Sequence, residues 1–210
     1  MADLRSIADA VKNGRAKVVK QLVPEALAEG IPVSEILNNG LLVGMTELGE
    51  LFKKNEVYVP EVLVAARAMK VGTDLLKPYM MSADIQSRGV VAIGTAKGDL
   101  HDIGKNLVRM MMEGSGFTVL DLGVDVAPEK FVEAVQTNGA QIVAISALLT
   151  TTMPAMRECI EALEKAGLRD KVKVMVGGAP VTQSFADEIG ADAYTPDAAS
   201  AAERAVELVS

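Results

Sequence analysis

The chain has 210 residues, of which 50% are hydrophobic and 3% aromatic, and its formal net charge is −7 at pH 7. A chain of this length buries roughly 70% of its unfolded surface, which suits one large domain or two small ones. The acidic balance argues against binding to nucleic acid, which needs clustered Lys and Arg, and no apolar signal region or membrane-spanning stretch is evident, so we expect a cytoplasmic protein without membrane contact.

Residues 1–82 have the periodicity of helices throughout. Two short helices are expected around residues 3–12 and 15–29, and Pro24 should kink or break the second of them because proline lacks a backbone N–H.

A longer helix is predicted from Ser34 through Phe52, because its apolar residues recur at 3.6-residue spacing. Pro60 suits the first turn of a further helix, which is expected to stop before Pro78. Together these helices predict a small helical bundle.

From residue 89 onward, short apolar runs of strand character alternate with helical stretches. The runs lie at 90–94, 118–122, 141–146, 172–176 and 192–194, and the helical stretches at about 104–115, 128–138, 153–166, 182–189 and 198–208. This alternation predicts an α/β fold with a five-stranded parallel sheet, in the flavodoxin-like (Rossmann-type) order 2-1-3-4-5. The expected organisation is a helical bundle cap at 1–82, a polar linker at 83–88 and a sheet domain at 89–210.

Ligands of open α/β sheets bind beyond the carboxyl ends of the strands, near the switch point of the strand order. Three unusual segments are expected to meet there: residues 95–104 after the first strand, 146–152 after the third, and Gly177-Gly178 after the fourth.

Each of these segments has an ordinary structural interpretation when taken alone. A lone histidine near a helix start, such as His101, is usually a packing or capping residue. Asp99 and Asp102 could cap the helix, the threonines at 150–152 could do the same, and Gly177-Gly178 could form a turn.

Their convergence favours a binding site. A carboxylate two residues from an imidazole can fix the tautomer of a ligating histidine, and adjacent glycines let the backbone approach a bulky ligand. The chain has one histidine and one cysteine, whereas a zinc site needs three or four protein ligands. A metal that relies on His101 must therefore bring most of its own ligands, and a corrin ring supplies four.

Three motifs carry a resemblance to a known family. Asp99-x-His101-x-x-Gly104 is followed by Ser146-x-Leu148 and then by Gly177-Gly178. The motifs and their intervals resemble the cobalamin-binding domains of methionine synthases, corrinoid methyltransferases and adenosylcobalamin mutases, and the likeness covers residues from about 88 to the C-terminus.

This resemblance implies base-off binding of cobalamin, with His101 as the cobalt ligand in place of the cofactor's own benzimidazole. Asp99 would bond the other ring nitrogen of His101. Methionine synthases complete this relay with a serine, and Thr152 stands at the matching position here.

The resemblance also assigns the rest of the site. Gly177 and Gly178 would line the nucleotide tail, and Ser146 would bond its base. The remaining expected cofactor-binding residues are Gly98, Asp102, Ile103, Gly104, Leu148 and Thr150.

The N-terminal half resembles the helical cap of methionine synthases and methyl-carrier corrinoid proteins. The likeness lies in segments such as Val59-Pro60-Glu61-Val62 and Ala65-Ala66-Arg67-Ala68-Met69-Lys70. In that family apolar cap residues cover the upper cobalt face, and Phe52, Val59 and Val62 occupy the matching positions; their alternative role is plain bundle core.

The implied function is methyl carriage, with the cofactor alternating between cob(I)alamin and methylcobalamin. No substrate pocket or second base is identifiable, so we interpret the chain as a carrier and not as a complete enzyme. The expected partners are a substrate-specific methyltransferase of the methylamine, glycine betaine, methanol or methoxyarene type, a second methyltransferase acting on tetrahydrofolate or coenzyme M, and a reductive activase.

Two other functions share parts of this pattern. The small subunit of an adenosylcobalamin-dependent mutase has the Asp-x-His-x-x-Gly motif but usually lacks the cap. A cobalamin-dependent regulator would add a helix-turn-helix, and a phosphoreceiver would need an Asp at the end of the third strand, where this chain has Ser146-Ala147-Leu148.

Overall fold

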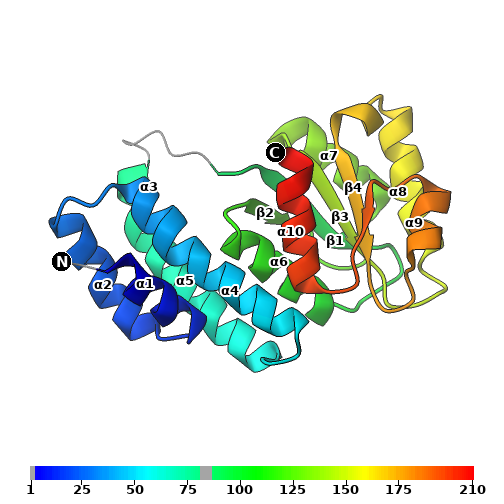
Figure 1. The fold of residues 1–210 in the computed structure, drawn as a ribbon. Coiled ribbons are helices and arrows are strands. Elements are labelled where there is room, and N and C mark those ends of the chain that lie inside the picture. Colours follow the sequence, from blue (N-terminus) through cyan, green and yellow to red (C-terminus); the bar gives the residue numbers. More distant parts are fainter. Residues whose placement is uncertain (1–2, 81–86) are drawn as a thin grey trace. The chain divides into compact units, whose positions relative to one another are not determined.

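The computed structural model describes residues 3–80 and 87–210 of the chain, and these residues form two compact units. The first unit contains the described residues up to Met80 together with Gly114–Gly116. The second contains Ser87–Glu113 and Phe117–Ser210 (Figure 1). Most of the linker expected at 83–88 lies outside the described residues.

The first unit is helical, as the sequence predicts. Its elements are α1 (Leu4–Lys12), α2 (Ala16–Ala28), α3 (Val33–Glu35), a π-helical turn (Ile36–Leu41), α4 (Leu42–Lys53) and α5 (Val59–Met80). Helix α1 packs against α2 and α4, and α2 runs along α5. Residues whose side chains are completely buried in these helices include Ile7, Val19, Val23, Leu41 and Leu76.

Neither Pro24 nor Pro78 ends the helix in which it lies. Pro24 lies within α2, and the predicted stop before Pro78 is wrong because α5 continues to Met80. Each proline removes one helical hydrogen bond, and both lie in the C-terminal half of their helices. Burial of Val23 and of Leu76 on the apolar faces favours continuation of both helices.

The helix predicted from Ser34 to Phe52 is interrupted by the π-helical turn. The Leu42 N–H donates to the carbonyl of Leu37, five residues back. Within this turn lies Gly40, and a Cβ there would come within 3.2 Å of the Ile7 side chain, so α1 approaches the backbone closely. This contact depends on tertiary packing, which the periodicity of the sequence does not contain.

The second unit contains the predicted five-stranded parallel sheet, and its order β2-β1-β3-β4-β5 is confirmed. The strands are β1 (Val90–Thr95), β2 (Thr118–Asp121), β3 (Ile142–Ser146), β4 (Lys173–Gly177) and β5 (Ala193–Tyr194). In the pairing register Thr95 lies beside Ser146, and Ser146 beside Gly177. The carboxyl ends of β1, β3 and β4 are therefore level with one another.

Helices cover both faces of this sheet. They are α6 (Ile103–Gly114), α7 (Pro128–Asn138), α8 (Pro154–Lys165), α9 (Gln183–Ile189) and α10 (Ala198–Val209), with a 3-10 turn at Arg169–Lys171. One core cluster joins the sheet to α7, α8 and α9 through side chains such as Phe131, Met156 and Ile189. Helices α6 and α10 lie on the opposite face (Figure 1).

Within residues 3–80 and 87–210, none of the helices combines the length and the apolar character that crossing a bilayer requires.

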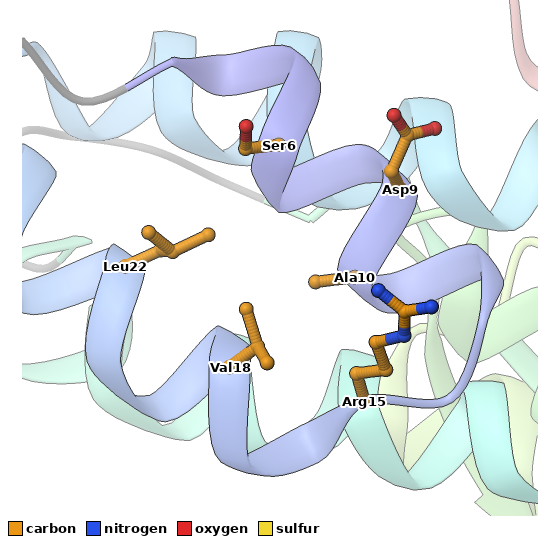
Figure 2. A pocket seen from close by; sticks show the side chains of 6 residues that line it. All are labelled: Ser6, Asp9, Ala10, Arg15, Val18 and Leu22. Atoms are coloured by element: carbon orange, nitrogen blue, oxygen red, sulfur yellow. The ribbon is translucent and has the colours of Figure 1, made fainter.

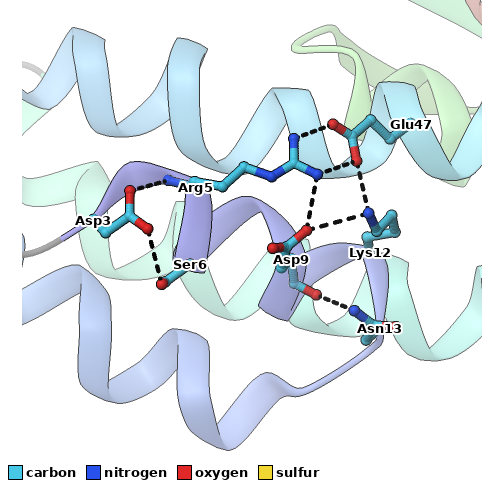
Figure 3. Close-up of polar contacts among 7 residues, drawn as sticks. All are labelled: Asp3, Arg5, Ser6, Asp9, Lys12, Asn13 and Glu47. Atoms are coloured by element: carbon cyan, nitrogen blue, oxygen red, sulfur yellow. Dashed lines mark hydrogen bonds and ion pairs between the residues drawn. The ribbon is translucent and has the colours of Figure 1, made fainter.

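An ion-pair cluster joins α1 to α4 in the first unit. Both Arg5 and Lys12 of α1 donate to the carboxylate of Glu47 on α4, Lys12 at 2.8 Å, and Asp9 pairs with the same two cations (Figure 3). The hydrogen bonds from Arg5 and Lys12 lower the pKa of Glu47 to about 2. The ionised carboxylate therefore stabilises the folded chain.

We expect Glu47→Gln to lower the free energy of unfolding at pH 7 by about 1 kcal/mol, since partly exposed ion pairs are screened. Because the folded pKa lies below the ordinary value of 4.5, the stabilisation is present above pH 4.5 and is lost as the pH falls toward 2. Urea unfolding of both chains between pH 2 and 7 should show the difference shrinking in that window. Glu207→Gln, which removes only the exposed partner of Arg204, is the control and should change little; an equal effect there would contradict the prediction.

Candidate functional site

The candidate site lies at the carboxyl edge of the sheet, where the loops after β1, β3 and β4 meet. The register that aligns Thr95, Ser146 and Gly177 brings the three sequence motifs onto one edge. The three motifs of the second unit therefore begin at the same edge of the sheet, on three different strands.

Asp99 is the centre of this site, and its side chain is completely buried. Its Oδ1 accepts from the backbone N–H of His101 at 3.1 Å and lies 2.7 Å from the Nδ1 of the same residue. Its Oδ2 accepts from the N–H groups of Leu148 at 2.7 Å and Leu149 at 3.3 Å, and from the Thr152 hydroxyl at 2.8 Å. The carboxylate thus ties the loop after β1 to the loop after β3.

The surroundings of Asp99 keep it ionised. Burial alone would raise the pKa of its carboxyl group, but the hydrogen bonds from Leu148, His101 and Thr152 hold that pKa well below its usual range. Facing an ionised carboxylate, Nδ1 of His101 acts as the proton donor of the pair.

This arrangement leaves Nε2 as the available ring nitrogen of His101. The side chain is 51% exposed, and the backbone carbonyl accepts from the buried Thr95 hydroxyl at 2.9 Å. No cluster of three or more His, Cys, Asp or Glu side chains that could hold a metal occurs among the described residues. A metal bound at Nε2 needs a further set of ligands from a cofactor.

The side chains around His101 fit a flat, largely apolar macrocycle. Leu100 and Ile103 are 72% and 77% exposed, and Leu148 and Leu149 are also exposed. Exposed leucines and isoleucines that follow one another on neighbouring loops are typical of a binding surface. The single available nitrogen of His101 and the exposed apolar side chains therefore suit a corrin, which brings four ligands of its own.

The glycines of the expected site differ in how much space their surroundings leave for a side chain. Gly178 has a φ of 126°, and a Cβ there would lie 1.9 Å from the carbonyl oxygen of Ala147, so the close approach of two loops requires glycine. A Cβ on Gly177 would come within 3.3 Å of the Thr195 carbonyl oxygen. Gly104, in contrast, faces open space. Gly98, in the loop after β1, is exposed.

The other expected site residues of the second unit differ in accessibility. Ser146 is half-buried at the end of β3, Thr150 is exposed, and Thr152 is buried. Asp102 accepts from the Asn106 side chain at 3.1 Å, at the start of α6. The structure therefore gives Asp102 a local role in the helix start.

The three expected cap residues lie in the first unit. Val62 is completely buried, Phe52 is half-buried and Val59 is exposed. Their contact with a cofactor stays a prediction.

The sequence analysis missed the loop after β2. Gly98 donates its N–H to the Asp125 carboxylate at 2.7 Å, and the Asp125 N–H donates to the carbonyl of Asp99 at 2.9 Å. The predicted strand order already places β2 beside β1, which was the signal that this loop would reach the site.

The sequence analysis also missed a part-buried ion pair between α6 and the end of β2. Lys105 of α6, 2% exposed, donates to Asp121 at the end of β2 at 2.6 Å. Asp121 also pairs with Arg109 and accepts from the Gly123 N–H. This pair fixes the first turn of α6, which directly follows His101 and Asp102.

A hollow of about 400 Å³ lies on the first unit between α1 and α2 (Figure 2). It is lined by Ser6, Asp9, Ala10, Arg15, Val18 and Leu22. It contains none of the expected cofactor-binding residues, and its acidic residue, Asp9, already pairs with Arg5 and Lys12.

Comparison with known proteins agrees with this geometry. Residues 89–206 match a family model described as a B12 binding domain, and residues 4–77 match a second model with the same description. The chain is 43% identical over 206 residues to dimethylamine corrinoid protein 3 of Methanosarcina acetivorans, covering 98% of this chain and 96% of that protein. It is 46% identical over 188 residues to trimethylamine corrinoid protein 1 of the same organism, covering 89% and 87%.

The structure also resembles that of the methanol:cobalamin methyltransferase complex MtaBC from Methanosarcina barkeri. The TM-score is 0.87 at 31% sequence identity, over 98% of this chain and 79% of the solved one. Two B12-binding matches, near-complete relatives named corrinoid proteins and a shared fold lead to one conclusion: the chain belongs to the family of cobalamin-binding corrinoid proteins that carry methyl groups in methyltransferase systems.

Proposed function

We propose that this chain carries a methyl group from a methylamine-specific methyltransferase to a second methyltransferase, on a cobalamin bound base-off with Nε2 of His101 as its lower cobalt ligand. The observation that carries the proposal is the half-exposed His101 ring, held through Nδ1 by the buried, ionised Asp99.

When bound, cobalamin supplies a cobalt centre that takes up and releases a methyl group. The chain's own residues prepare the ligand for it. Asp99 keeps the proton of the His101 ring on Nδ1 and orients the ring, which leaves the lone pair of Nε2 free. The Thr152 hydroxyl donates a hydrogen bond to Asp99 and so stabilises the ionised carboxylate. Leu100 and Ile103 provide apolar surface that excludes water from the macrocycle.

The relatives support the methylamine class of methyl donor. Those described above are named for dimethylamine and trimethylamine, and they align with most of this chain. Tetrahydrofolate or coenzyme M is the proposed final acceptor class, and a reductive activase is a further proposed partner. The match of residues 4–77 to a B12-binding model favours methyl carriage over the small subunit of a mutase.

For the domain organisation we propose a cap at 1–82, a linker at 83–88 and the cofactor domain at 89–210. Among the proposed cap contacts, Val59 has the most accessible side chain, whereas Val62 is completely buried.

Replacement of His101 tests the ligand directly. We expect His101→Ala, reconstituted with hydroxocobalamin, to bind at least about tenfold more weakly and to lose the visible spectrum of a histidine-ligated cofactor. The chain has one histidine, so ¹⁵N-histidine labelling of untagged protein isolates its coupling to cobalt(II) in an EPR spectrum. Identical EPR spectra from labelled and unlabelled protein would contradict ligation by His101.

Thr152 should support the ionised Asp99. Removing its hydroxyl in Thr152→Val takes one donor from a buried carboxylate, and we expect the free energy of unfolding at pH 7 to fall by about 2 kcal/mol. Because the folded pKa of Asp99 is lowered, its stabilisation is present above pH 3.8 and is lost only at more acid pH, where the difference between the chains should shrink.

The control for this prediction is Thr152→Ser, which keeps the hydroxyl and should retain most of the stability in denaturant titrations from pH 2 to 8. Equal destabilisation by serine and valine would show that the methyl group, and not the hydrogen bond, is important.

The methyl donor is tested by presenting the cobalamin-loaded chain to methyltransferases specific for dimethylamine, trimethylamine or methanol. We expect transfer from one of the two methylamine enzymes to be at least about tenfold faster than transfer from the methanol enzyme, measured from the visible spectrum. Faster transfer from the methanol enzyme would overturn the proposed donor class while leaving ligation by His101 intact.

A further inference from the structure

The loop after β2 contributes Asp125, which bonds to the backbone of Gly98 and Asp99. We propose that Asp125 is a positioning residue for the Asp99–His101 pair, acting as a brace that fixes the loop after β1. This proposal rests on the proposed function of His101 as the cobalt ligand.

The brace consists of two reciprocal hydrogen bonds. The carboxylate of Asp125 accepts the N–H of Gly98 at 2.7 Å, and the backbone N–H of Asp125 donates to the carbonyl of Asp99 at 2.9 Å. The first contact holds the peptide unit between Lys97 and Gly98, and the second holds the unit between Asp99 and Leu100, so together they span Gly98 and Asp99. Asp99 is therefore held through its backbone by the β2 loop and through its carboxylate by Leu148, Leu149 and Thr152 of the β3 loop.

The neighbouring backbone continues this pairing beyond the two strands. Thr95 donates its N–H to Gly123 at 3.0 Å and accepts from Val126 at 2.9 Å, and Ala96 forms an isolated parallel bridge with Val126. The Thr95 hydroxyl in turn binds the carbonyl of His101. Movement of the β2 loop would therefore displace both Asp99 and His101.

The backbone conformation of Asp125 limits what can replace it. Its φ is 53°, in the left-handed region that L-residues seldom adopt but that Asp and Asn enter more readily than most. A short side-chain acceptor is also needed for the N–H of Gly98. Asparagine meets both requirements, glycine meets only the backbone requirement, and alanine meets neither.

The half-exposed position of His101 makes this brace relevant to function. The ring is oriented by one short contact, 2.7 Å from Nδ1 to Asp99. A small displacement of the Asp99 backbone would lengthen that contact and release the ring, even in a chain that remains folded. Residues that orient a metal-ligating histidine typically change metal affinity by 10- to 100-fold when replaced.

The test compares Asp125→Gly and Asp125→Asn in the full-length, untagged chain. Long-range ¹H–¹⁵N NMR spectra of the cofactor-free protein report the tautomer of the single histidine, and titration with hydroxocobalamin gives the Kd. We expect Asp125→Gly to remain folded, to show a mixed His101 tautomer and to bind about tenfold more weakly, while Asp125→Asn stays within about twofold of the unsubstituted chain.

The matched control is Asp192→Ala, which removes a carboxylate that accepts the N–H of Val174 at 2.7 Å near the amino ends of the strands. It should leave the tautomer and the Kd unchanged. An unchanged tautomer and Kd in Asp125→Gly would overturn the brace, as would equal losses in Asp125→Asn or in Asp192→Ala.

Failure of the proposed function would be recognised separately. If His101→Ala gave the same cofactor spectrum as the unsubstituted chain, ligation by His101 would fail. The tautomer measurement, made without cofactor, would still decide whether Asp125 positions the pair.

Discussion

The structure of the site depends on one buried carboxylate, that of Asp99. A buried charge is tolerated only when hydrogen bonds replace the lost water, and Asp99 receives them from His101, Leu148, Leu149 and Thr152. These donors come from loops that follow two different strands. The need to satisfy this charge therefore fixes how the loops after β1 and β3 meet at the edge of the sheet.

The hydrogen-bonded carboxylate of Asp99 would prepare His101 for its proposed role as the cobalt ligand. Nδ1 of His101 faces Asp99, so Nε2 remains available on a half-exposed ring. Leu100 and Ile103, close to His101 in the chain, have exposed apolar side chains. Exposed apolar side chains of this kind fit the binding surface proposed for the cofactor.

Two further sets of contacts hold the loop after β1 and the start of α6 in place. The part-buried Lys105–Asp121 pair fixes the start of α6 after the His101 loop, and Asp125 binds the backbone at Gly98 and Asp99. Both supports begin at the end of β2, a strand at the edge of the sheet. Precise ligand geometry commonly depends on such outer contacts as much as on the ligand itself.

The sequence by itself determined the helical first half, the five parallel strands and their order, and the motifs around His101, because hydrophobic periodicity is a local property and open α/β sheets adopt few strand orders. It did not reveal the π-helical turn at Ile36–Leu41, the continuation of α5 past Pro78 or the contacts of Asp125. These depend on burial and on backbone groups that meet from distant parts of the chain. Only the tertiary structure, by saturating Asp99 from two loops, decided which nitrogen of His101 is free.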